Sequence, residues 1–379
     1  TNRSASSSQN QNYQFNTNLL LEYTKSFNDH NIKAMGGYET LQFRSDNISV
    51  SKRNFPNNAV TGLDAGLELA AGGASVVEWA MQSYFGRINY NFKDKYLLEA
   101  NFRADGSSRF KDGNRWGYFP SFSAGWNISE EAFMSDIEAI DLIKLRASWG
   151  QLGNNRIGNY AYLSTYALNQ NYSFDGQVYP GIAQTSLTNE EIKWEETTTT
   201  NIGLDATLFD GKITFSTEYF IRQTDGILTD LPIPEFLGAK TAPTVNLASM
   251  ENKGIEFVAG YRGSKGDLTY NISANFATVE NKVTEYFSDI KTGGIQEGYA
   301  FQSFYGYESL GIFKSQEEID NAPTHRANTV PGDLRMKDQL TEDTDGDGIP
   351  DAGNGVIGSE DKVIIGNPIP KYTFGANLG

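Results

Sequence analysis

The feature that most constrains the fold is an alternation of apolar and polar side chains in residues 83–128. Residues 84–92 and 96–104 carry aromatic, aliphatic or small side chains at even positions and mostly polar ones at odd positions. The polar turn 93–95 separates these two runs, and a longer polar connection, residues 106–115, precedes a third run that ends at Ile128. Successive side chains of a strand point to opposite faces, so each run predicts a β-strand with one apolar and one polar face.

The same pattern returns along most of the chain and predicts roughly a dozen strands. Strands of about ten residues with this period are typical of a transmembrane β-barrel, whose outer face meets lipid and whose inner face meets water. The sequence contains no run of 18 apolar residues, so no transmembrane helix is expected. The predicted fold class is all-β, an antiparallel up-and-down transmembrane barrel.

The connections between these strands alternate in length. Short turns are predicted at residues 27–30, 93–95, 129–136, 210–211 and 263–267, with a short capped helix in 129–140. Long connections are predicted at residues 44–75, 106–115, 151–193, 223–251 and 278–299. An up-and-down barrel collects all short turns at one end and all long loops at the other, whereas a soluble Greek-key sandwich has no reason to do so. The alternation therefore favours the membrane barrel over a soluble β-protein.

Composition limits the classes of function. The formal net charge is −16, which argues against a nucleic-acid-binding surface. There is no cysteine, and the two histidines, His30 and His325, belong to no zinc or nucleophile motif. A cluster of glutamates in 190–196 resembles the paired carboxylates of a glycosidase, but a solvated loop explains it better. We therefore expect a protein that is not an enzyme.

Several motifs add a specific resemblance to the SusC-like family of TonB-dependent outer-membrane transporters (SusC/RagA type). They follow the family's order and cover nearly the whole chain. The matching segments are residues 84–90 (YFGRINY), 95–98 (KYLL), 103–110 (RADGSSRF), 117–121 (GYFPS), 124–126 (AGW), 142–146 (LIKLR), 150–154 (GQLGN), 194–195 (WE), 200–205 (TNIGLD), 252–256 (NKGIE) and 331–333 (PGD).

This resemblance implies a 22-stranded barrel in the bacterial outer membrane, closed by an N-terminal plug and covered by a SusD-like surface lipoprotein. It also implies import of oligosaccharides, or in some members peptides, with energy from the TonB complex. Residues 1–379 would form part of the barrel, without the plug, the TonB-contacting segment and the last strands. We expect the given sequence to begin within a polar loop, at residues 1–12, and to end within a strand, at residues 371–379. Residues 314–370 read as a long insert whose side of the membrane the pattern does not fix.

The insert contains one motif typical of a metal site. Asp343, Asp345 and Asp347 alternate before Gly348, as in calcium-binding loops, and Asp351 follows. The twelfth position of the loop is Asn354 instead of a bidentate glutamate, and an insertion moves the next candidate to Glu360 or Asp361. The sequence thus predicts a Ca²⁺ site at Asp343, Asp345, Asp347, Asp351 and Asp361, with an unoccupied acidic turn as the alternative. No other cofactor is expected.

Substrate contacts are expected in the long loops. The connection 151–193 is rich in tyrosine, asparagine and glycine, and aromatic rings there would stack on sugar rings while amides bind hydroxyls. The alternative is that these rings pack the loop against its neighbours. A passive porin or a surface glycan-binding β-protein remains an alternative to active import. The candidate residues are Tyr160, Tyr162, Tyr166, Tyr172, Tyr179 and Trp194.

Overall fold

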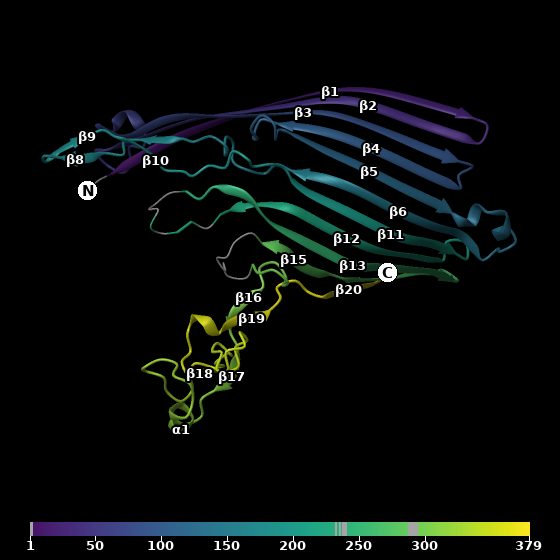
Figure 1. Ribbon diagram of the computed structural model, residues 1–379. Helices are drawn as coiled ribbons and strands as arrows, with labels where there is room; N and C mark the ends of the chain where they lie inside the picture. Colours follow the sequence, from purple (N-terminus) through teal and green to yellow (C-terminus); the bar gives the residue numbers. More distant parts are fainter. Residues whose placement is uncertain (1–2, 232, 235, 237–240, 287–294) are drawn as a thin grey trace.

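The computed structural model describes residues 3–231, 233–234, 236, 241–286 and 295–379. Within these ranges twelve strands form one antiparallel sheet, and neighbours in the sheet follow the order of the sequence (Figure 1). The exception is β15, which pairs with β13 beside the main path. The sheet contains β1 (Ser4–Phe27), β2 (His30–Arg53), β3 (Glu68–Phe92), β4 (Tyr96–Ser107), β5 (Trp116–Asn127), β6 (Ile140–Asn154), β11 (Glu195–Leu208), β12 (Ile213–Asp230), β13 (Thr244–Lys265), β14 (Leu268–Thr278), β15 (Glu280–Tyr286) and β20 (Tyr372–Leu378).

The apolar face of this sheet is uncovered. On β1, Leu19 and Leu21 are 69% and 77% exposed, and on β3 Ile88 is 56% exposed. The register pairs the apolar positions of each strand with those of the next, so one continuous apolar surface runs across the sheet. An apolar surface of this extent requires lipid or another sheet against it, which confirms the all-β, partial-barrel prediction.

Aromatic residues mark two levels on the apolar face. One cross-strand row, nearer the short turns, runs through Phe27, His30, Phe92, Tyr96 and Trp126. The second row contains Leu19, Tyr38, Tyr84, Ala104 and Tyr118, and each member lies eight positions from the member of the first row on its own strand. Eight residues span about 26 Å along a strand, or about 20 Å along the membrane normal at a tilt of 40°. This separation is close to the height of the apolar band between the aromatic girdles of outer-membrane barrels.

The two ends of the sheet differ as the loop lengths predict. Turns of two to four residues join β1 to β2, β3 to β4, β11 to β12 and β13 to β14 at one end. The long connections gather at the other end, where the small strands β7 (Tyr166–Leu168), β8 (Tyr172–Phe174), β9 (Gln177–Tyr179) and β10 (Ile182–Gln184) lie (Figure 1). The predicted alternation of short and long connections holds at these four turns, but residues 128–139 join β5 to β6 and are longer than the predicted turn 129–136 and than the connection 108–115 at the other end.

Two predicted loops are much shorter than expected. β2 continues to Arg53 and β3 begins at Glu68, so residues 54–67 connect them instead of 44–75. Likewise β12 continues to Asp230 and β13 begins at Thr244, although residues 232, 235 and 237–240 of that connection lie outside the described part. These strand extensions lie beyond the aromatic rows, where both faces meet water. They therefore show no apolar alternation that a pattern could reveal.

The predicted short helix in 129–140 is wrong. Two 3₁₀ turns, Ile128–Glu130 and Ala132–Met134, replace it, and neither has a side-chain cap. Glu131 instead accepts hydrogen bonds from Tyr96 Oη at 2.6 Å and Trp126 Nε1 at 3.1 Å. The carboxylate thus holds two rings of the aromatic row, and its partners draw the segment back toward the sheet.

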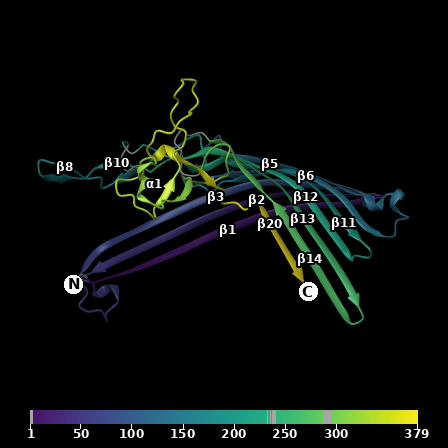
Figure 2. The same ribbon diagram turned by 90° about the horizontal axis from the view of Figure 1, so that it is seen from below.

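The chain between β15 and β20, which includes the predicted insert 314–370, leaves and re-enters the sheet at the long-loop end. Its elements are β16 (Phe304–Tyr307) and β17 (Ser309–Ile312), which precede the insert, and α1 (Gln316–Asp320), β18 (Leu334–Met336) and β19 (Lys362–Gly366) within it. Figure 2 shows these elements toward the end that carries β8 and β10, away from the short turns. Residues 287–294, which belong to the predicted connection 278–299, lie outside the described part. No helix in the described ranges is long and apolar enough to cross a membrane.

Candidate functional site

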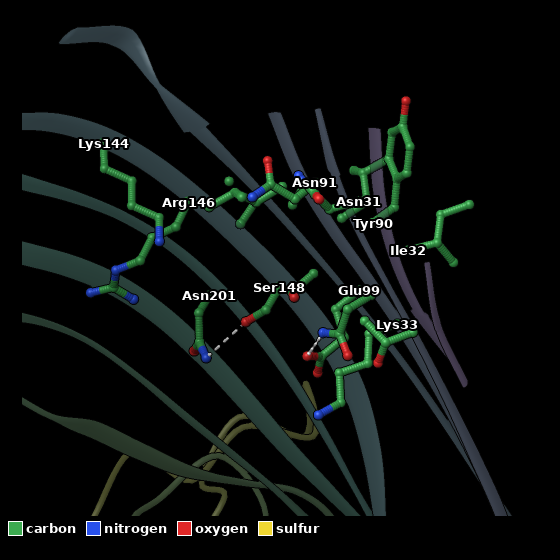
Figure 3. Close-up of a pocket in the computed structure, with 18 of the residues that line it drawn as sticks. Asn31, Ile32, Lys33, Tyr90, Asn91, Glu99, Lys144, Arg146, Ser148 and Asn201 are labelled. Carbon is green, nitrogen blue, oxygen red and sulfur yellow. Dashed lines mark hydrogen bonds between the residues drawn. The ribbon is translucent and has the colours of Figure 1, made fainter. Parts of the chain in front are cut away.

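The inner face of the sheet carries the groups that can meet a polar ligand. A hollow of about 530 Å³ lies on β1–β6 and β11, and its labelled lining residues include Lys33, Glu99, Lys144, Ser148 and Asn201 (Figure 3). A volume of this size suits a small ligand or a segment of a larger one. Cross-strand register, rather than proximity in sequence, brings these side chains together.

Side-chain hydrogen bonds run across this face. Glu99 accepts from the amides of Asn89 and Asn101, the latter at 2.8 Å, and Asn101 also donates to Ser121 Oγ at 3.1 Å. Farther along, Asn201 Nδ2 donates to Ser148 Oγ at 3.3 Å. The wall thus presents oriented amide, hydroxyl and carboxylate groups, which are donors and acceptors for a hydroxylated or peptidic ligand.

Charged side chains on the inner face are paired across strands. Arg146 Nε donates to Asp205 at 3.0 Å, and its Nη1 pairs with Glu218 on the next strand. A Cβ at Gly203 would lie 2.6 Å from the Arg146 guanidinium carbon, so glycine leaves the space through which the arginine reaches both carboxylates. Lys144 has no ion-pair partner within the described ranges. It is therefore a cation that can meet an anionic group in the hollow.

The predicted tyrosines fall into two groups. Tyr166, Tyr172 and Tyr179 are 63%, 68% and 53% exposed and lie on the projecting part of the loop. Tyr172 and Tyr179 are cross-strand partners in the β8–β9 hairpin, so they share a face with Phe174, which is 65% exposed. Tyr160 is also exposed, whereas Tyr162 packs against a buried cluster at the loop base. The structure therefore places three rings on one accessible hairpin surface.

Trp194 does not belong to that surface, contrary to its place among the stacking candidates. It is 5% exposed, packs on Phe110 with ring centroids 5.2 Å apart and meets the edge of Phe119 at 5.5 Å. Its Nε1 donates to Arg115 O at 2.9 Å. A ring with both faces covered cannot stack on a ligand, so Trp194 is a packing residue at the base of the loop.

The acidic loop brings three of the five predicted metal ligands together. Carboxylate oxygens of Asp343, Asp345 and Asp347 lie within 4.8 Å of one another, and all three side chains are exposed. Asp343 accepts from the N–H groups of Gly346 at 2.7 Å and Gly348 at 2.8 Å, and both glycines have positive φ, 79° and 88°. These hydrogen bonds hold the pKa of Asp343 below its usual value. The carboxylate therefore stays ionised in mild acid, as metal binding requires.

The two remaining predicted ligands have different surroundings. Asp351 accepts from Thr344 N at 3.0 Å and Thr344 Oγ1 at 2.7 Å, which closes the acidic loop and lowers the pKa of Asp351. Asp361 is fully buried and accepts from Gln339 N at 2.8 Å and Gly358 N at 2.7 Å. Asp361 is outside the cluster because its carboxylate satisfies buried backbone groups. The three clustered carboxylates offer only oxygen ligands, which suits Ca²⁺, but fewer than the six to eight that it takes.

The residues of the inner hollow are not distinguished by any motif in the sequence. Their signal is the polar half of each alternating run, at Asn89, Glu99, Ser148 and Asn201. A single strand pattern shows that these residues face inward but not which of them become neighbours. Pairing register decides that, and it depends on turn geometry between strands.

Comparisons with known proteins agree with this geometry. The family model described as "TonB dependent receptor-like, beta-barrel" matches residues 1–358. TonB-dependent receptor P3 of Formosa agariphila is 33% identical over 386 residues, which cover 96% of this chain and 37% of the relative. TonB-dependent receptor SusC of Bacteroides thetaiotaomicron is 32% identical over 372 residues, covering 96% of this chain and 36% of SusC. The chain thus spans little more than a third of the length of these relatives.

Solved structures show the same fold. The RagAB peptide transporter matches with a TM-score of 0.80 at 23% identity, covering 100% of this chain and 40% of the transporter chain. The outer-membrane transporter YddB of Escherichia coli matches with a TM-score of 0.52 at 12% identity, covering 74% and 34%. The uncovered apolar face, the sorted loops and these matches lead to one assignment: the chain belongs to the TonB-dependent receptor-like β-barrel family, of SusC type, in the bacterial outer membrane.

Proposed function

We propose that the protein forms the barrel wall of an active importer that takes oligosaccharides, or alternatively peptides, across the outer membrane. The observation that carries this proposal is the two-sided sheet, with an uncovered apolar face outside and a hydrogen-bonding face inside. Membership of the SusC-type family supports import with energy from the TonB complex. The structure named a peptide transporter supports peptides as the alternative substrate class.

A SusD-like surface lipoprotein is the proposed partner at the long-loop end. The connections 54–67, 108–115 and 155–194 and the insert all lie at this end, so a lid there would meet several of them. The relatives are much longer than the region that matches this chain. We expect the plug and the TonB-contacting segment to lie in the part of the relatives outside the matched region. At the long-loop end, the projecting hairpin β8–β9 offers an accessible surface of three aromatic rings for substrate capture.

Removing residues 166–184, the projecting finger that carries β7 to β10, should reduce substrate uptake without unfolding the barrel. Residues 166–184 can be replaced by a short Gly-Ser linker, because Thr165 Oγ1 and Ser186 Oγ are only 3.1 Å apart. We expect uptake by the full-length transporter to fall about tenfold or more, since capture by stacked rings is lost. Uptake of labelled oligosaccharide or peptide by cells, with heat-modifiable migration as the measure of folding, tests this expectation.

A matched pair of substitutions narrows the test to one face of the hairpin. Tyr172→Ala with Tyr179→Ala removes two rings from one face, whereas Ser173→Ala with Val178→Ala changes the opposite face. Only the first double variant should lose uptake. Wild-type uptake by both the first double variant and the linker variant would exclude the finger from substrate capture.

We also propose that the acidic loop binds Ca²⁺ through Asp343, Asp345 and Asp347, with Asp351 closing the loop. Three carboxylates in close proximity repel one another, and a divalent cation removes that repulsion. Calorimetric titration of the full-length protein should show heat on addition of Ca²⁺, and Asp343→Asn with Asp345→Asn should abolish it. Asp361→Asn is unsuitable as a ligand control because Asp361 is a buried structural residue. Absence of heat for the wild type would refute calcium binding.

A further inference from the structure

The connection 107–115, which includes Ser107 at the end of β4, contacts both ends of the loop 155–194. At the first end, Ser107 is 1% exposed and its Oγ accepts from Asn155 Nδ2 at 3.0 Å. Arg109 Nη1 donates to Asn155 O at 3.1 Å, and Arg109 Nε donates to Asn159 Oδ1 at 3.0 Å. One short segment thus binds the backbone and two side chains of the loop at the point where it leaves β6.

At the second end apolar packing is joined by two hydrogen bonds, from Trp194 Nε1 to Arg115 O at 2.9 Å and from Asn114 Nδ2 to Ile192 O at 3.4 Å. Phe110 and Ile192 are both completely buried, and Phe110 packs on Trp194, where the loop enters β11. Ile157, from the first end, belongs to the same buried cluster. The two ends of the loop are therefore joined to each other through the connection 107–115, and together they form a small core outside the membrane band.

Arg109 occupies an unusual environment within this contact. No carboxylate of the described residues lies within ion-pair distance of its guanidinium, which stacks 4.9 Å from the centroid of the Trp79 ring. Partial burial lowers the pKa of Arg109. A planar guanidinium can stack and bond two neutral acceptors simultaneously, which an ammonium cannot do in the same geometry. Because its partners are all neutral, Arg109 serves to hold these groups in position and does not neutralise a charge.

We propose that Arg109 is the positioning residue of the loop 155–194 and that the connection 107–115 sets where the projecting finger is held. This inference rests on the proposed function, in which the finger captures substrate. Apart from the connection 107–115, the loop also bonds to the rest of the chain at residues 185–187, whose backbone bonds to Thr241, and at Lys193, whose backbone exchanges hydrogen bonds with the Asn246 side chain. Loosening the base should therefore release the whole loop while leaving the strands paired.

The sequence offers a sharp assay for this release. Arg156 and Lys193 flank the loop, and no lysine or arginine lies between them. The side chains of Arg156 and Lys193 are exposed. Arg156 is followed by the buried Ile157, and Lys193 lies between the buried Ile192 and Trp194. Trypsin can cut the loop only at these two sites, and cleavage needs the base to open. Release of the fragment 157–193 from intact cells, measured by mass spectrometry, therefore reports the position of the loop directly.

Arg109→Ala in the full-length transporter should release this fragment about tenfold faster than wild type, with unchanged heat-modifiable migration. The matched control is Lys111→Gln, which breaks the exposed pair with Glu190 and should release it at the wild-type rate. Arg109→Lys keeps the charge but cannot reproduce both hydrogen bonds, so it should also accelerate release, and it serves if Arg109→Ala does not assemble. Uptake by assembled variants should show an apparent KM raised about tenfold, with a smaller change in maximal rate.

Wild-type rates of release in Arg109→Ala, or in Arg109→Lys where only that variant assembles, would overturn the proposal. Equal acceleration by Lys111→Gln would also overturn it, because any local change would then suffice. If the wild-type protein imports nothing while the variants still release the fragment faster, the proposed import fails but the positioning role stands. Faster release with an unchanged apparent KM would show that the held position of the loop does not serve substrate capture, and would refute that part.

Discussion

Replacing Gly254 with alanine is expected to destabilise the barrel by about 3 kcal/mol, in the upper range for overpacking in a well-packed site. A Cβ at this position would lie 1.9 Å from Thr278 O, a backbone atom that cannot rotate away. The contact arises because β13 changes partners here, from β15, which ends its pairing at Lys253, to β14, which begins at Glu256. The glycine of the segment 252–256 is thus explained by a close approach of two backbones.

A matched substitution separates this contact from the general effect of adding a methyl group to a strand. Gly36 lies within β2, and a Cβ at this position would have no heavy atom within 4 Å, so Gly36→Ala should change stability by less than about 0.5 kcal/mol. Reversible guanidinium unfolding of the full-length protein in lipid vesicles measures both. Equal midpoints for the two variants would show that the Thr278 contact is absent from the folded barrel.

The membrane-spanning part of the fold could be predicted from sequence because lipid imposes a rule on every residue there. Along 84–92 each even position faces lipid and most odd positions face polar surroundings, so the period of two is visible without an alignment. Beyond the aromatic rows this constraint ends. The sequence of residues 44–53 and 68–75 therefore predicts a loop, although these residues belong to the strands β2 and β3.

The candidate sites divide along similar lines. The acidic cluster was predictable because its members are two residues apart, and a tight turn must bring them together. The role of Trp194 was not, because its covering partners Phe110 and Phe119 lie more than 70 positions away and meet it only in the folded sheet. The same holds for Asn201 and Ser148, whose pairing depends on the register of β6 with β11.

A charge placed on the apolar face should be far more costly than the same charge on the neighbouring residue. Ile88 lies four positions from both Tyr84 and Phe92, at the middle of the band between the aromatic rows. An arginine at the bilayer midplane costs about 2–4 kcal/mol in such barrels. Asn89 is the next residue but faces inward, where its amide donates to Glu99, and an arginine there would meet that carboxylate. We expect Asn89→Arg to remain within about 1 kcal/mol of wild type.

The difference in unfolding free energy between Ile88→Arg and Asn89→Arg, measured for the full-length protein in lipid vesicles, directly tests whether the apolar face meets lipid. Each variant adds one positive charge and three side-chain heavy atoms at adjacent positions of one strand, and the two positions differ in the face of the sheet toward which the side chain points. An outer-membrane barrel wall predicts that Ile88→Arg is less stable by about 2–4 kcal/mol. Equal stabilities, or a larger loss for Asn89→Arg, would contradict the assignment of the apolar face to lipid.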